Sequence, residues 1–184
     1  MSALILPEEK LLVSPGSVAG IYYSPLSSTK DNPNLMKSVK WIEAIVDRGL
    51  RYEGEWDRYA DKKGSFSDKK SERFNRQVSF MNARFFEGTQ FTHEDSWRNV
   101  ITKGTELLWL LPTSTEPGKA FRIGTAWFQA EKYLDPCKGP SARTGKPGFK
   151  ETFVDCGAII ARVIRSGGFR VDDPIFHEKK KYGD

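Results

Sequence analysis

Cysteine and histidine are scarce in this sequence of 184 residues. Its two cysteines, Cys137 and Cys156, are too few for a disulfide framework or for an all-cysteine zinc site. The two histidines, His93 and His177, lie far apart in the sequence, and neither belongs to a metal-ligand spacing such as H-x-x-x-H. We therefore predict two free thiols, no bound metal and no catalytic residue among these four.

Long apolar runs and phosphate-binding loops are also lacking. No stretch approaches the roughly 18–20 apolar residues that span a bilayer, and the start, MSALILPEEK, lacks the basic and long apolar regions of a secretory signal. The stretch RSGGFR matches neither G-x-G-x-x-G nor the P-loop pattern. These absences predict an intracellular protein (cytoplasmic, nuclear or within a virion), not a secreted one, with no cofactor and no membrane partner.

Positive charge, by contrast, is plentiful and unevenly placed. The formal net charge is +5 and the isoelectric point is about 9.1. Residues 58–84 hold eight Lys or Arg against three acidic residues, and residues 138–150 hold four against none. The rest of the chain is therefore acidic overall. Basic segments of this kind indicate a polyanionic partner.

The stretch DNPNLMKSVKWIEAIVDRGL carries the best helix signals of the chain. Asn32 can cap the free amides at the start of a helix, and Gly49 suits a left-handed exit. Apolar residues between them recur every three or four positions, the period of one helical face. We predict a helix over residues 33–48.

Two further helices are predicted downstream. In residues 71–86, SERFNRQVSFMNARFF, apolar side chains again fall on one helical stripe. After it, Thr92 and Asp95 resemble a capping box, with Asp in place of the usual Glu or Gln, and Gly104 can end a short helix that starts there.

The C-terminal third is rich in aromatic and branched residues, which favour strands. Residues 105–112, 120–134 and 150–164 are long, apolar and separated by turn formers, so we predict three antiparallel strands in a meander. With the first turn inside TSTEPGK, Trp109 would face Ile123 across the ladder.

These elements together predict an α+β fold in which N-terminal helices pack on a C-terminal antiparallel β-meander, a curved sheet or partly open barrel. Residues 1–184 would form a single globular domain. We expect a flexible basic loop at 135–148 and a polar C-terminal tail at 177–184.

A short stretch near the N-terminus resembles a nuclease motif. Gly20, Ile21 and Tyr22 match the first half of the GIY-YIG signature, but no Tyr-Ile-Gly or Tyr-Val-Gly follows nearby. We therefore expect the stretch GIYY to form an ordinary strand, and no site residue is carried over from that family.

Cations interleave with aromatic rings between residues 56 and 86, an arrangement that suits phosphates and stacked bases of a single strand. We predict a non-enzymatic basic binding module for nucleic acid, either single-stranded DNA or RNA, with the two basic segments forming one surface. The residues expected to contact the nucleic acid are Arg58, Tyr59, Lys62, Lys63, Lys69, Lys70, Arg73, Arg76, Lys138, Arg143, Lys146 and Lys150.

Two alternatives stay open. The first is a structural or assembly subunit of a virion, such as a viral or phage protein, or of another large complex, in which the loop and the tail would order against neighbouring subunits or hetero-partners. The second is a small cofactor-free enzyme with a buried carboxylate as general base. Glu106, Glu131 and Asp155 lie in or beside apolar stretches, and Asp155 is the preferred candidate.

Overall fold

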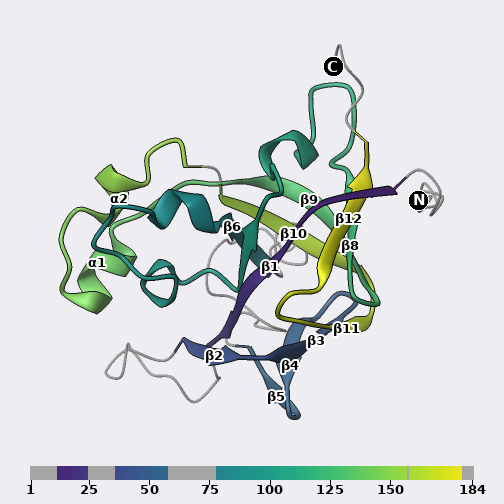
Figure 1. The fold of residues 1–184 in the computed structure, drawn as a ribbon, viewed down its shortest axis with the longest axis horizontal. Coiled ribbons are helices and arrows are strands. Elements are labelled where there is room, and N and C mark those ends of the chain that lie inside the picture. Colours follow the sequence, from purple (N-terminus) through teal and green to yellow (C-terminus); the bar gives the residue numbers. More distant parts are fainter. Residues whose placement is uncertain (1–11, 25–35, 58–77, 157, 180–184) are drawn as a thin grey trace.

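The computed structural model describes residues 12–24, 36–57, 78–156 and 158–179. Within these ranges the chain is mostly β-structure, and the ribbon in Figure 1 shows strands wrapping around a common centre. The basic residues between 58 and 77 fall outside the described part of the chain.

Seven described strands form a closed barrel in the order β12-β8-β9-β10-β6-β7-β1, and the pairing of β1 with β12 closes the ring. All neighbouring pairs are antiparallel except β6 and β7, which are parallel. An eighth strand, β2, extends the sheet beside β1. The bounds are β1 Leu12–Tyr23, β2 Lys37–Val39, β6 Val78–Asn82, β7 Val100–Lys103, β8 Ala120–Ile123, β9 Ala126–Leu134, β10 Ala158–Arg165 and β12 Pro174–Glu178.

A second, smaller antiparallel sheet has the order β11-β3-β4-β5 and lies at the bottom of Figure 1. Its inner side chains belong to the same hydrophobic cluster as the barrel interior, so the small sheet packs against the barrel. The bounds are β3 Trp41–Ile45, β4 Gly49–Tyr52, β5 Glu55–Trp56 and β11 Gly167–Arg170.

Helical structure is short throughout the described residues. The α-helices are α1 Gly139–Thr144 and α2 Phe149–Thr152, at the left of Figure 1. Single 3₁₀ turns cover Ala83–Phe86, Glu94–Ser96 and Leu108–Leu110.

The barrel interior is filled by aromatic rings. Phe80, Phe121 and Phe128 are fully buried, and their ring centroids lie 5.2–5.4 Å apart. A second cluster, which includes Phe149 and Phe153, joins α2 to the barrel wall. Burying rings of this size contributes the largest favourable share of folding free energy.

The predicted α+β arrangement is wrong, because the helix expected over residues 33–48 is absent from its described part. Residues 37–45 form β2 and β3 instead. The aromatic and branched residues in KSVKWIEAIV favour a pleated strand over a helix. Gly49 does adopt a left-handed conformation, with φ of 96°, but it follows Asp47, with φ of 58°, in the turn of the β3–β4 hairpin.

The prediction of a helix over residues 71–86 is also wrong within the part of it that the structure describes. Residues 78–82 form β6, and only residues 83–86 turn, as a 3₁₀ helix. Residues 71–77 of this prediction lie outside the described residues. Here the apolar stripe reflects a barrel strand that is buried along most of its length.

The third helix is reduced to one 3₁₀ turn, Glu94–Ser96. The capping box itself is confirmed: the Thr92 amide donates to Asp95 Oδ2 at 2.7 Å, and the Asp95 amide donates to Thr92 Oγ1 at 3.4 Å. The residues that should have continued the helix run into β7 because Trp97 takes a left-handed conformation with φ of 57°.

The C-terminal strands are only partly as predicted, although GIYY lies inside β1 as expected. The stretch 120–134, predicted as one strand, is the β8–β9 hairpin, and the stretch 150–164 begins in α2 and becomes β10 only at Ala158. However, residues 108–110 form a 3₁₀ turn, so Trp109 does not pair with Ile123. Ile123 pairs with Ala126 across a tight turn at Gly124, which has φ of 55°.

Two segment predictions also change. The segment 135–148 is not simply a loop, because α1 occupies much of it. The predicted polar tail begins inside β12, where His177 is only 4% exposed, and residues 180–184 lie outside the described chain.

Candidate functional site

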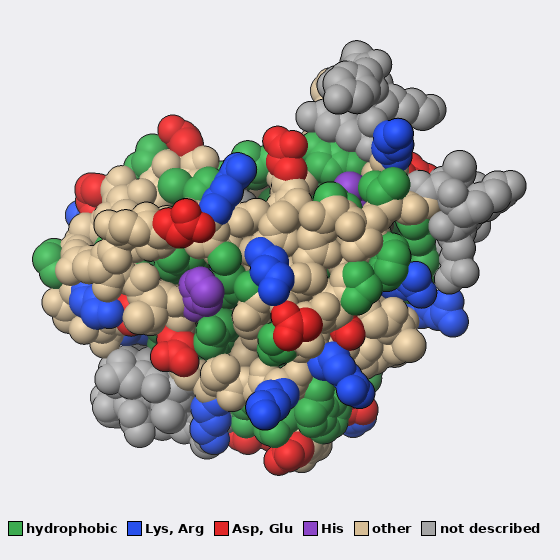
Figure 2. Space-filling model, in the orientation of Figure 1, with side chains coloured by type: hydrophobic (Ala, Val, Ile, Leu, Met, Phe, Trp, Pro, Cys, Tyr) green, Lys and Arg blue, Asp and Glu red, His purple; other side chains and the backbone are tan. Residues whose placement is uncertain are grey.

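The structure describes four of the twelve predicted nucleic-acid contacts: Lys138, Arg143, Lys146 and Lys150. The other eight, from Arg58 to Arg76, lie outside the described residues. The convergence of the two basic segments on one surface therefore stays a prediction. On the face in Figure 2, Lys and Arg side chains are dispersed among carboxylates and do not form one continuous patch.

The four described cations belong to a helical cap, which we define as residues 135–153 with Asp95 and Trp97. The sequence builds this cap from turn formers. Pro140 suits the first turn of α1, Gly145 ends that helix with φ of 70°, and Gly148 precedes α2 with φ of 85°. Phe149 and Phe153 are almost fully buried and anchor the cap to the barrel.

Two of the cations hold the cap together. Lys146 Nζ lies 2.6 Å from Asp95 Oδ2. Burial opposes ionisation of Asp95, but the hydrogen bonds from Lys146 and Thr92 outweigh it and lower the pKa of this carboxyl group. The Arg143 guanidinium lies over the ring of Trp97, 4.2 Å from its centroid, which is a cation–π contact.

The other two cations are available to a ligand. Lys138 and Lys150 are exposed, and neither forms an ion pair with any described residue. Lys138 lies at the edge of an open hollow of about 450 Å³. The hollow is lined by Lys138, Ser141, Ala142, Gly145, Pro147, Gly148 and Glu151.

Cys137 is an exposed free thiol at the same end of the cap, as the sequence predicts. Arg143 Nη1 and Cys137 Sγ lie 2.8 and 3.4 Å from the point where a Cβ on Gly139 would stand. A thiol and a guanidinium therefore share the space left by the missing side chain. Cys137 lies in DPCKGPSARTGKPG, a run of turn formers and cations. This composition is the feature of the sequence that indicates an exposed thiol in basic surroundings.

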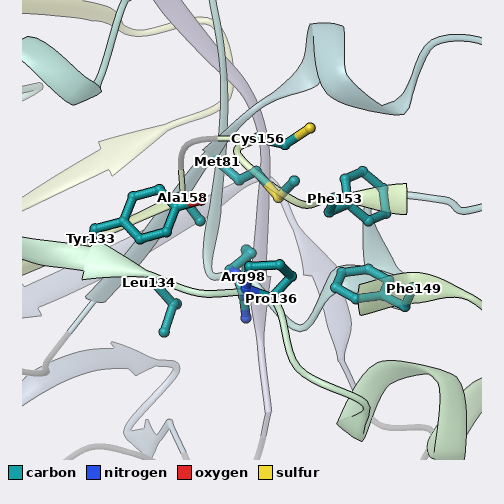
Figure 3. Close-up of a pocket in the computed structure, with 9 residues that line it drawn as sticks. All are labelled: Met81, Arg98, Tyr133, Leu134, Pro136, Phe149, Phe153, Cys156 and Ala158. Atoms are coloured by element: carbon teal, nitrogen blue, oxygen red, sulfur yellow. The ribbon is translucent and has the colours of Figure 1, made fainter. Parts of the chain in front are cut away.

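A small, partly open pocket lies beneath the cap and is lined by residues of α2 and of the barrel wall. Figure 3 shows the Arg98 side chain among apolar residues there, and Arg98 is only 7% exposed. The cavity is about 10 Å³, which is room for about one water molecule. Its lining is Met81, Arg98, Tyr133, Leu134, Pro136, Phe149, Phe153, Cys156 and Ala158.

The carboxylate proposed as a general base does not have the predicted surroundings. Asp155 is exposed, in a turn with φ of 60°, and is not buried in a strand. Glu131 is better shielded: burial raises its pKa, and Arg162, whose Nε lies 3.2 Å from Glu131 Oε1, partly offsets that rise. Burial, with a smaller effect of Asp155, raises the pKa of the Cys156 thiol, so this thiol is poorly ionised.

The two histidines sit in separate aromatic settings. His93 is half-buried, with its ring 4.9 Å from Phe86 and 6.4 Å from Tyr22, and burial lowers its pKa. His177 is buried in β12 against Trp109.

Within the described ranges, no group of three or more His, Cys, Asp and Glu side chains could hold a metal ion, and no helix has the length and hydropathy to cross a membrane. The predictions of no metal and no cofactor stay predictions.

The closed barrel with a small second sheet is an architecture shared with several crystal structures. The chain is similar to the YuaD protein from Bacillus subtilis, with a TM-score of 0.68 and 18% identity, over 92% of this chain and 98% of that one. It is also similar to YiiM from Geobacillus stearothermophilus, with a TM-score of 0.61 and 13% identity, over 92% and 78% of the two chains. YiiM from Escherichia coli has a TM-score of 0.55 and 15% identity, over 91% and 70%.

At these identities the likeness shows a shared fold alone. No family model matches the sequence, and no curated protein matches it. Function must therefore be argued from the residues of this chain.

Proposed function

We propose that the protein is a non-enzymatic binding module for a ligand with oxyanion groups, and that these groups contact the helical cap at Lys138 and Lys150. The observation that carries the proposal is that both ammonium groups are exposed and form no ion pair with described residues. Lys146 and Arg143 are engaged with Asp95 and Trp97, so they hold the cap in shape.

Phosphate is the oxyanion that this arrangement suits best. Lysine ammonium groups bind phosphates as point charges, and the glycine-rich connection between α1 and α2 lets a ligand approach the backbone. The finer form of the proposal is nucleic acid, as single-stranded DNA or RNA, whose backbone would contact the cap and the basic segment 58–84. A small phosphorylated ligand, in contrast, would contact only the cap.

The test compares the affinities of a small and a large ligand for the full chain, for a double variant of the cap and for a matched control variant. Calorimetric titration of the full chain with tripolyphosphate and with a 12-nucleotide single strand is expected to show binding that weakens steeply with salt. The double change Lys138→Ala and Lys150→Ala should weaken both about thirtyfold, because two phosphate contacts are lost and each costs about a kcal/mol. The matched control, Lys132→Ala with Lys179→Ala, removes two exposed lysines outside the cap.

The outcomes separate the two forms. Loss of tripolyphosphate binding with an unchanged oligonucleotide affinity would show that nucleic acid does not use the cap. No binding of either ligand at low salt would overturn the anion-binding proposal. An assembly role stays a prediction, which light scattering at high protein concentration would check.

A second candidate function, thiol chemistry on an anionic substrate, is favoured by the approach of Arg143 to Cys137 over Gly139. A guanidinium beside a thiol would draw an anionic electrophile to the sulfur. Iodoacetate, which is anionic, should then alkylate Cys137 faster relative to neutral iodoacetamide than it does Cys156. Arg143→Gln should remove this preference at Cys137. An equal reagent ratio at both thiols would exclude this function.

A further inference from the structure

We propose that the outer face of the small sheet is a second binding surface, and that its partner is a single-stranded nucleic acid. We call this surface the Trp–Arg face. It consists of Trp41, Glu43, Arg48, Arg51, Trp56 and Arg170.

Strand alternation separates this face from the core. Ile42, Ala44, Leu50 and Phe169 are 0–3% exposed and point toward the barrel. Because successive side chains of a strand point to opposite faces, Trp41 and its i+2 neighbour point outward. The register then aligns Arg170 with Trp41 across β11 and β3, and Arg51 with Trp56 across β4 and β5.

Aromatic rings and guanidinium groups alternate across the surface. Arg48 lies over the ring of Trp56, 4.1 Å from its centroid, and Arg51 lies 5.4 Å from the same centroid. Trp41 is 40% exposed, which is unusual for a side chain of this size. Its ring contacts Tyr52, which packs against the barrel cluster, at 5.5 Å between centroids. Trp41 is therefore held at the margin of the face while much of its ring faces solvent.

The face as defined holds three arginines and one carboxylate, Glu43, which is held by Arg51 at 2.8 Å. Three further carboxylates of the small sheet, Asp47, Glu53 and Glu55, lie beside it in the turns and in β5, so the positive charge is local to the arginines. Arg170 is exposed and forms no ion pair within the described ranges. In Figure 2, basic, acidic and hydrophobic side chains lie together over the lower part of the molecule, where Figure 1 places the small sheet.

A partner that complements this face must combine negative charge with planar rings. Single-stranded nucleic acid does so, because its phosphates can contact arginine while an unpaired base stacks on the exposed indole ring of Trp41. A duplex hides the faces of its bases, and an acidic peptide supplies charge without rings. The arrangement therefore favours single strands over both.

This inference does not rest on the anion site of the helical cap. The small sheet and the helices α1 and α2 lie in different parts of the molecule in Figure 1. A substitution on one surface can therefore weaken binding there without affecting the other surface.

The test measures fluorescence anisotropy of a labelled 12-nucleotide single strand, its duplex and a poly-glutamate peptide with the full chain. We expect the single strand to bind more tightly than the other two. Trp41→Ala should weaken binding of the single strand by about tenfold, within the range for loss of one stacked base. Arg170→Gln should reduce the slope of log affinity against log salt by about one.

Matched controls are Leu108→Ala, which removes a side chain that is also 40% exposed, and Arg165→Gln, which removes an exposed arginine on β10. Both should leave the affinity unchanged. Trp41→Phe keeps a ring and should retain most of the binding even if Trp41→Ala lowers the melting temperature. The proposal is overturned if the duplex or the peptide binds as tightly as the single strand, or if Trp41→Phe is as weak as Trp41→Ala.

Discussion

At the scale of single residues, the helical cap depends on a few buried rings. Phe149 is fully buried, with ring centroids 4.5 Å from Phe153 and 5.2 Å from Phe91. Its neighbour Lys150 is exposed and has no ion pair among the described residues. One residue thus anchors the cap while the next one faces solvent.

This contrast predicts opposite outcomes for two adjacent substitutions. Phe149→Ala should lower the free energy of unfolding by about 3–5 kcal/mol, because it removes a ring from a packed cluster and leaves a cavity. Lys150→Ala should change it by less than about 0.5 kcal/mol. Urea denaturation followed by circular dichroism measures both values. Similar losses for the two variants would show that Phe149 does not anchor the cap.

At the residue scale, contacts between sequence neighbours can be predicted from the sequence, whereas contacts between distant segments cannot. The Thr92–Asp95 capping box could be predicted because it depends on two side chains three positions apart. The pairing of Lys146 with Asp95 and the stacking of Arg143 on Trp97 could not, because they join segments about 50 residues apart. The sequence alone therefore does not distinguish these two structural cations from exposed, unpaired ones.

At the scale of elements, the sequence predicts that the C-terminal third is rich in strands but does not predict their number or bounds, because 120–134 is the β8–β9 hairpin and 105–112 contains a 3₁₀ turn. The aromatic and branched residues of this third are separated by clear turn formers. The sequence predicts a helix over residues 33–48 because Val39, Ile42 and Val46 recur at helical spacing. In the structure Val39 and Ile42 are buried from two different sheets, and Val46 is 37% exposed. A short apolar pattern of this kind cannot distinguish a helix from two strands joined by a turn.

The contact between β11 and the β8–β9 turn offers a test at this scale. A Cβ on Gly167 would stand 2.4 Å from the Thr125 carbonyl carbon, whereas a Cβ on Gly168 would meet nothing closer than Ile42 O at 3.8 Å. Gly167→Ala should therefore destabilise the protein by about 1–3 kcal/mol, because backbone must move to admit the methyl group. Gly168→Ala should be neutral or slightly stabilising. Thermal unfolding of the two variants compares neighbours on one strand, and equal melting temperatures would contradict this close packing.

At the scale of the whole molecule, the barrel exists because β1 pairs with β12, which joins residues from the two ends of the described chain. Such closure leaves no local signal in the sequence, since the contacting residues are about 160 positions apart. The sequence therefore indicated a curved sheet or a partly open barrel but could not show that the sheet closes. For the same reason, the sequence does not show whether the basic segments 58–84 and 138–150 converge on one surface, because their relative position depends on the closed fold.

His177 lies at this seam, and we expect its burial to make barrel closure sensitive to acid. Its Nδ1 lies 2.6 Å from the Glu178 carbonyl oxygen, to which it donates, and Nε2 is buried without a hydrogen-bond partner among the described residues. Burial lowers the pKa of His177, and the carbonyl only partly opposes this. The unfolded chain therefore binds a proton more readily than the folded one. Stability is complete above the unfolded pKa of about 6.5 and is lost as pH falls below it.

The same sign applies to His93, whose pKa burial also lowers, so two variants are needed to assign the effect. We expect the free energy of unfolding of the unmodified chain to fall between pH 7.5 and pH 5, measured by urea titration. His177→Phe should flatten this dependence, because a neutral ring then fills the space beside Trp109 at every pH. His93→Gln, at a half-buried position away from the seam, should remove a smaller part of it. If His177→Phe keeps the full pH dependence while His93→Gln loses it, the acid-sensitive group is His93 and the β1–β12 seam is insensitive to acid.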